Sequence, residues 1–275
     1  DLFTDHPDKP LDAMNPQREP TFINWLPFYT LLQKEIRRFL RVASQTLVTP
    51  VITASLYLFI FGATLGERIS VLEGFSYAQF VIPGLILMGV INNSFSNVAS
   101  SLFMSRYLGN IVDLLVTPIT PAQFILAYTL AAMLRGLAVG TTVWIISCLF
   151  ASLPWAHPLA AIVMACLASF LFAQFGIIAA IHADNFDSLS MYTNFIILPL
   201  IYLGGVFYPI SILPSIWAKL SHLNPLFYLI DGFRHALLGV GDLSFAVSFS
   251  VVAVMALVLF CWAAILITRS YRLRN

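Results

Sequence analysis

Four polar residues recur at helical spacing in one apolar stretch of the chain. Asn93, Ser96, Asn97 and Ser100 stand at i, i+3, i+4 and i+7, so they would share one face of a helix. Amide and hydroxyl groups need hydrogen-bond partners in hydrocarbon, so this face must meet protein or water rather than lipid. Two roles fit: hydrogen bonds between helices, or the polar wall of a translocation pathway.

A formal charge, Arg135, falls inside an apolar core segment. An ionisable residue at such a position is a functional candidate and must find a partner or water. Gly136 and Gly140 form a GxxxG pair beside it, which favours close approach of a second helix. Because no Asp or Glu lies in a core segment, we expect Arg135 to be anchored on backbone carbonyls, with substrate contact as the alternative.

Aromatic side chains supply a second kind of candidate surface. They are Tyr57 and Phe61 in one apolar run and Tyr192, Phe195 and Tyr202 in or near another. Their rings could line a path for an apolar or sugar-bearing substrate. The alternative is that they pack or anchor helices at the membrane interface, which is the common role of aromatics in membrane helices.

These residues do not indicate an enzyme. The core segments lack acidic residues and an H-E-x-x-H pattern, so we predict no catalytic residue and no metal site. A passive channel would need a ring of charge or a carbonyl filter, and neither pattern is visible. The net charge of +1 gives no reason to expect nucleic acid as a partner.

Composition places the chain in a membrane. Hydrophobic residues make up 59% of the chain and charged residues 10%, with a mean hydropathy of +0.87. Soluble domains carry about 25% charged residues. The apolar runs exceed the roughly 20 residues that cross a bilayer, and Pro154 and Pro158 divide the longest one. We predict an all-α integral membrane protein whose six spans cover residues 44–65, 77–103, 121–151, 158–181, 189–206 and 244–268.

The basic residues predict the orientation. Eight Lys and Arg residues flank the span ends that lie on the same side of the membrane as the two termini, and three lie on the opposite side. Since basic loops stay inside, both termini are expected in the cytoplasm. Residues 1–20 are polar and acidic, which predicts an added or disordered tail ahead of a membrane domain over 21–275.

Three segments outside the spans have helical patterns of their own. Residues 25–41 predict an amphipathic helix with one apolar and one basic face, which either touches anionic lipid or docks a soluble partner. Residues 109–118 predict a short cytoplasmic helix, followed by a cap at Thr120, and its apolar face either lies on the bilayer surface or inserts into a groove on another protein. Residues 203–242 predict two short helices, from Pro214 to about Leu220 and from Pro225 to Gly239, with Asp231 pairing with Arg234 on the second.

Two separated motifs in this frame resemble those of ABC-2 type permeases, most closely the YadH-like and nodulation J-like branch. The stretch from Gly109 to Thr120 is similar to the coupling-helix signature of that family, with Asp113 where many relatives have Glu. The second motif lies between residues 204 and 239, and residues 34–39 resemble the family's interface helix. The second motif consists of Gly204, Gly205, Phe207, Pro209, Leu213, Pro214, Trp217, Asn224, Pro225, Tyr228, Arg234 and Gly239.

The resemblance implies a transmembrane subunit of an ATP-driven exporter. It implies an N-terminal amphipathic interface helix, a cytoplasmic coupling helix and a re-entrant extracytoplasmic hairpin before the last span. The residues expected to contact a separate ATPase are Gly109, Asn110, Ile111, Asp113, Leu114, Leu115, Pro118, Lys34, Glu35, Arg37 and Arg38. Those expected to have a structural or gating role are Arg135, Gly204, Gly205, Pro209, Asn224, Pro225 and Arg234.

The expected assembly has two permease and two ATPase subunits, in contact with membrane lipid, and the permease pair is a homodimer. ATP and Mg²⁺ would bind to the partner, since this chain has no GxxxxGK[ST] loop and so no cofactor of its own. Relatives of this family carry drugs, lipo-oligosaccharides or polysaccharide-linked lipids, so a lipid-linked polysaccharide is an alternative substrate. An intramembrane enzyme or a channel is the alternative outside the family.

Overall fold

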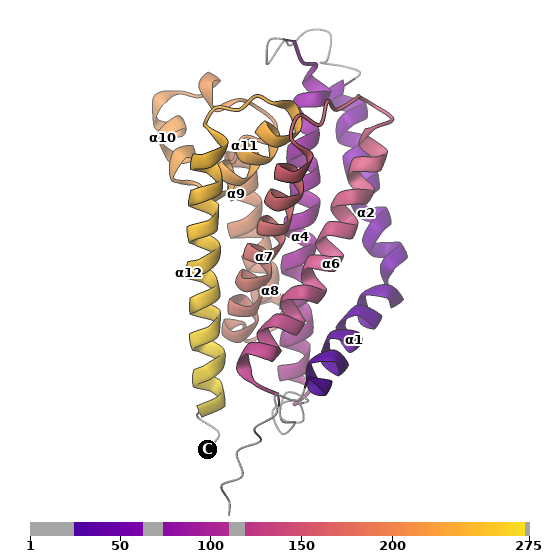
Figure 1. The fold of residues 1–275 in the computed structure, drawn as a ribbon, viewed down its shortest axis with the longest axis vertical. Helices are drawn as coiled ribbons and strands as arrows, with labels where there is room; N and C mark the ends of the chain where they lie inside the picture. Colours follow the sequence, from indigo (N-terminus) through magenta and orange to yellow (C-terminus); the bar gives the residue numbers. More distant parts are fainter. Residues whose placement is uncertain (1–24, 63–73, 110–118, 273–275) are drawn as a thin grey trace, which may run out of the picture.

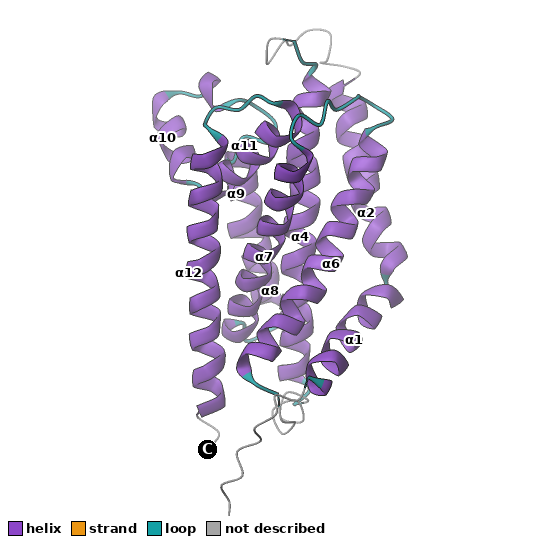
Figure 2. Ribbon diagram, viewed as in Figure 1, coloured by secondary structure: helices purple, strands orange, loops and turns teal. Residues whose placement is uncertain are grey.

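The computed structural model describes residues 25–62, 74–109 and 119–272, and these form helices joined by loops, with no strand among them (Figure 2). Six helical segments are long and apolar enough to cross a membrane, as predicted. They are Ala43–Phe61, Tyr77–Tyr107, Pro121–Ser147, Pro158–His182, Phe186–Leu203 and Phe245–Arg269. Each begins within three residues of its predicted start, so the fold class expected from the sequence is confirmed.

Helix α4 (Tyr77–Tyr107) lies at the centre of the bundle, between α6 (Pro121–Ser147) and α7 (Pro158–His182) (Figure 1). Small residues allow these helices to approach closely. A Cβ atom added to Gly136 or Gly140 of α6 would collide with Ser94 or Val90 of α4. The close helix contact predicted from the GxxxG pair is therefore confirmed.

The starts of α4 and α6 are defined by local sequence. Ser76 and Thr120 each accept a hydrogen bond from the backbone of the third helical residue, which is Gln79 or Gln123, and form a capping box with it. Pro121 occupies the first turn of α6, where its missing N–H costs no helical hydrogen bond.

Three spans lie at the periphery of the bundle. The first is α2 (Ala43–Tyr57) with η1 (Leu58–Gly62), the fifth is α8 (Phe186–Met191), η2 (Tyr192–Ile197) and α9 (Leu198–Leu203), and the last is α12 (Phe245–Arg272). Only 17%, 17% and 22% of their most apolar windows are buried, against 56–67% in the central three. Their exposed faces are apolar and open to lipid or to another subunit.

Helix α1 (Leu26–Arg41) precedes the spans and slants along the lower half of α6, against which it packs (Figure 1). The predicted amphipathic helix is present, and its buried residues are Phe28, Leu31, Glu35 and Phe39. Its position at the membrane surface stays a prediction.

The segment before the last span contains η3 (Ile210–Ile212), α10 (Ser215–Leu223) and α11 (Pro225–Leu238). The two predicted short helices are thus confirmed. The side chain of Asn224 caps α11, and Gly239 ends it with a φ of +78°, a backbone conformation that glycine adopts without strain. A re-entrant placement of this pair stays a prediction.

Candidate functional site: a charged cluster between α1, α4 and α6

Three polar side chains from three helices meet at one amide group. Oδ1 of Asn97 in α4 accepts a hydrogen bond from Nη2 of Arg38 in α1 at 2.8 Å and one from Nη1 of Arg135 in α6 at 3.4 Å. Nη2 of Arg38 also donates to the backbone carbonyl of Asn97 at 2.7 Å. Asn97 is fully buried, and it holds the two guanidinium groups beside each other.

Glu35 supplies the negative charge of this cluster. Its carboxylate is 0% exposed; it forms an ion pair with Nε of Arg38 at 3.1 Å and accepts a hydrogen bond from the Ser101 hydroxyl at 2.8 Å. Burying an ion pair costs desolvation, which hydrogen bonds to the remaining lone pairs offset. Within α1, Glu35 therefore pairs with Arg38, and its hydrogen bond from Ser101 joins α1 to α4.

The acceptors of Arg135 differ from those predicted. Its guanidinium donates to side-chain amide oxygens, Oδ1 of Asn93 at 3.3 Å and Oδ1 of Asn97, so the expectation of backbone carbonyls was wrong. Amide side chains present oxygen atoms that take no part in the helical hydrogen bonds, so they can accept from a guanidinium group. The ring of Phe39 lies 6.0 Å from Cζ of Arg135.

The polar stripe of α4 thus faces the two arginines along three of its four residues. Asn93 and Asn97 bind Arg135, and Ser100 lies 3.5 Å from Nη1 of Arg38, while the carbonyl of Ser96 accepts the Ser100 hydroxyl at 2.6 Å. Sequence reasoning did not connect Glu35 or Arg38 to this stripe. One signal was present: Glu35 occupies the helical register of Phe28, Leu31 and Phe39, which is the buried face.

A crevice of about 210 Å³ adjoins the cluster. It lies between α2, α4 and α6, and Asn93 belongs both to its lining and to the set that binds Arg135. The other lining residues are Thr49, Pro50, Thr53, Ala54, Leu85, Met88, Gly89, Asn92 and Val143.

The predicted aromatic residues separate into two places. Tyr57 and Phe61 stack at 5.9 Å, and both contact Phe207, which also stacks on Tyr202 at 5.9 Å. Tyr192 instead packs on Phe175 of α7, and Phe195 is 74% exposed. The structure therefore joins three of the five predicted rings.

Arg234, in α11, lies at the other end of the bundle. Its Nη2 donates to the carbonyl of Gly205 at 2.6 Å, and its Cζ lies 3.9 Å from the ring centre of Phe80. The predicted ion pair with Asp231 does not form, because the Asp231 carboxylate accepts the backbone N–H groups of Asp242 and Leu243 at 2.7 and 3.1 Å.

Burial changes the acid–base properties of both groups. Desolvation raises the pKa of Asp231, although its hydrogen bonds and the charge of Arg234 oppose the shift. Desolvation also lowers the pKa of Arg234 to about 10.

The other residues predicted for this end hold the α11 segment in place. Nδ2 of Asn224 donates to the carbonyl of Leu200 at 2.6 Å, and a Cβ on Gly204 would lie 2.8 Å from Ile230. Pro209 precedes η3, and Pro225 fills the first turn of α11.

The residues assigned to ATPase contact are only partly visible. Gly109 ends the described segment after α4 with a φ of +74°, whereas Asn110, Ile111, Asp113, Leu114, Leu115 and Pro118 lie outside the described residues. Lys34 and Arg37 are exposed on α1. Surface contact by Glu35 needs correction, since it is fully buried in the cluster.

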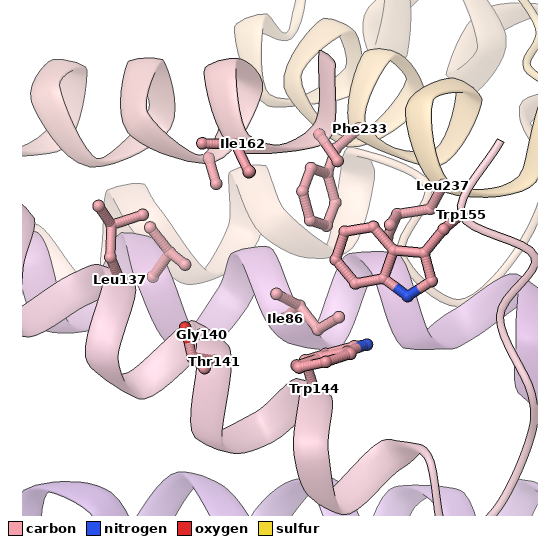
Figure 3. Close-up of a pocket in the computed structure, with 12 residues that line it drawn as sticks. Ile86, Leu137, Gly140, Thr141, Trp144, Trp155, Ile162, Phe233 and Leu237 are labelled. Carbon is pink, nitrogen blue, oxygen red and sulfur yellow. The ribbon is translucent and has the colours of Figure 1, made fainter. Parts of the chain in front are cut away.

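An apolar cavity of about 220 Å³ lies near the Trp155 turn, between α4, α6, α7 and α11 (Figure 3). The rings of Trp144 and Trp155 meet edge to face at 5.1 Å on its border. Across the described ranges, no group of three His, Cys, Asp or Glu residues is arranged to hold a metal ion.

Comparison with known proteins identifies relatives along most of the chain. The profile of the family described as "ABC-2 type transporter" matches residues 27–238. The chain is 43% identical over 256 residues to "Inner membrane transport permease YadH" of Escherichia coli (strain K12), covering 91% of this chain and 98% of the relative. It is 27% identical over 182 residues to "Nodulation protein J" of Sinorhizobium fredii (strain NBRC 101917 / NGR234), covering 66% and 70% of the two chains.

Proposed function

This chain belongs to the ABC-2 type transporter family, and we propose that it is the permease subunit of an ATP-driven exporter that moves an amphipathic or hydrophobic substrate out of the cytoplasm. The observation that carries the proposal is the family match over residues 27–238 together with six helices able to span a membrane. Drugs, lipids and glycolipids are the proposed substrate classes.

Energy would come from a separate ABC ATPase, which binds ATP and Mg²⁺. We propose two copies of each subunit, with a homodimer of this chain in the inner membrane and both termini in the cytoplasm. The weakly buried faces of α2, the Phe186–Leu203 span and α12 leave apolar surface that a second copy could cover.

Contact with the ATPase is assigned to the segment around Leu114 and Leu115 and to the exposed Lys34 and Arg37 of α1. Polar residues near the cluster, Asn93 above all, would border the pathway, and the Arg234 region would close its outer end. The hydrogen bonds from Arg38 to Asn97 and from Ser101 to Glu35 support mechanical coupling, because they join α1 to α4 and would transmit a tilt of α1 to it.

The test is the double variant Leu114→Asp with Leu115→Asp. If both leucines insert into a groove on the ATPase, their burial contributes about 1.5 to 3 kcal/mol each, so ATPase association and transport should be lost. Membrane insertion should stay intact. The matched control is Leu223→Asp in α10, an exposed leucine in the extracytoplasmic segment.

Affinity pull-down of the ATPase and ATP-dependent uptake into inverted vesicles are the measurements. Recovery of the ATPase at wild-type yield by the double variant would overturn the docking assignment. Uptake that does not depend on ATP would overturn the exporter itself.

A further inference from the structure

The charged cluster between α1, α4 and α6 carries more positive than negative charge. Two guanidinium groups, those of Arg38 and Arg135, face one carboxylate, that of Glu35. In the described part of the chain, the faces that α4 and α2 turn to the cluster offer amides and hydroxyls, and Glu35 is the acid that α1 offers. Excess positive charge at partly buried groups favours binding of an anion that compensates it.

The donors of the cluster also exceed its acceptors. Oδ1 of Asn97 already accepts from both arginines, which fixes the orientation of this amide. Its Nδ2 group is then a buried donor with no partner among the described residues. Two partly exposed guanidinium groups and a free amide N–H are the groups that bind a phosphate or carboxylate oxygen in proteins.

The crevice beside the cluster provides space for an apolar chain. Its volume of about 210 Å³ is several times the roughly 30 Å³ that one water molecule takes in the liquid, and its walls are largely apolar. Asn93 joins the two places, because it lines the crevice and accepts a hydrogen bond from Arg135. The cluster lies inside the bundle and not at its end, because Asn97 is ten residues, or about 15 Å along the helix axis, before the end of α4.

We propose that this cluster binds the acidic head group of an amphiphile whose chain enters the crevice between α2 and α4. The ligand class is a phosphate or carboxylate attached to an alkyl or acyl chain. The inference rests on the proposed export function for the claim that this amphiphile is transported, but the binding itself does not depend on it. A resident anionic lipid would offer the same chemistry.

The test measures equilibrium binding of radiolabelled dodecyl phosphate to the full chain in phosphatidylcholine nanodiscs. Arg135→Gln removes one positive charge, and we expect it to weaken binding at least about tenfold. Arg135→Lys keeps the charge and should retain most of the binding. Lys219→Gln removes an exposed charge from α10 as the matched control and should bind like the wild type.

Head-group recognition is tested with dodecyl phosphocholine, whose phosphate is neutralised by its choline. It should bind at least about tenfold more weakly than dodecyl phosphate to the wild type. Equal binding of the two probes would overturn the proposal, as would wild-type affinity in an Arg135→Gln variant that elutes as a folded protein in size-exclusion chromatography.

A second variant keeps the test independent of the arginine. Thr53→Trp fills the crevice without changing any charge, so it should weaken dodecyl phosphate much more than butyl phosphate. Equal effects on both chain lengths would overturn the assignment of the crevice.

The source of the ligand is decided with the ATPase present. Stimulation of ATP hydrolysis by dodecyl phosphate in the wild type and not in Arg135→Gln identifies a transported amphiphile. Binding without stimulation identifies a resident lipid, and either result keeps the site. Failure of the exporter proposal would be distinct, since transport of every candidate would be independent of ATP while dodecyl phosphate still bound.

Discussion

The contact between α4 and α6 at Gly136 leaves no space for a larger side chain. A Cβ atom at this position would lie 2.0 Å from Oγ of Ser94, 3.0 Å from Oγ of Ser169 and 3.0 Å from the carbonyl oxygen of Val90. Gly136→Ala must therefore separate the helices or displace Ser94, whose hydroxyl is hydrogen-bonded to Ser169 at 2.6 Å.

Overpacking costs about 1 to 3 kcal/mol, loss of the serine hydrogen bond about 0.6, and the better helix propensity of alanine returns about 1. The expected net loss of unfolding free energy for Gly136→Ala is therefore about 0.6 to 2.6 kcal/mol. At about 2 to 4 °C per kcal/mol, the melting temperature should fall by several degrees.

The assay is thermal unfolding of the purified chain in detergent, with Gly89→Ala as the matched control. Gly89 lies in the same helix pair, but its nearest neighbour is a methyl group of Val139 at 3.2 Å, which can shift. That control should melt at or slightly above the wild-type temperature.

A double variant tests the assigned cause. Ser94→Ala removes the atom closest to the new Cβ, so Ser94→Ala with Gly136→Ala should be more stable than the sum of the two single losses by more than about 0.5 kcal/mol. Additive losses, or equal melting of Gly136→Ala and Gly89→Ala, would refute the close-contact argument.

Three further predictions concern charge and orientation. Glu35→Gln leaves Arg38 without its carboxylate, so the unfolding free energy should fall by about 1.5 to 3 kcal/mol in denaturant titration, whereas a loss below about 0.5 kcal/mol would show that the ion pair is dispensable. Because burial raises the pKa of Asp231, the folded state holds its proton more tightly, and this contribution to stability is present at low pH and lost as the pH rises through the folded pKa. The melting temperature of the wild type minus that of Asp231→Asn should therefore increase from pH 7 to pH 4, and a decrease would contradict the shift. With the native cysteines replaced, Ala156→Cys should react with an impermeant maleimide outside the cell and Leu108→Cys should not; both positions are exposed, and labelling of Leu108→Cys from outside would reverse the topology.

Local sequence determined the elements of this protein. The six spans follow from uncharged apolar runs, because a helix in hydrocarbon satisfies its backbone hydrogen bonds internally wherever such a run is long enough. The start of α6 and both ends of α11 follow from Thr120, Asn224 and Gly239, since caps act within a few residues. The GxxxG pair likewise predicted a close helix contact at Gly136.

Only the tertiary structure decided which polar residues meet. Arg38 and Asn97 are 59 residues apart and Asn97 and Arg135 are 38 apart, so their contact depends on the tilt and rotation of three helices. Helical periodicity gives the spacing of residues on one helix but not the neighbour that its face contacts. For the same reason Glu35, read from the sequence as part of a basic surface helix, proved to be the buried counter-charge of Arg38.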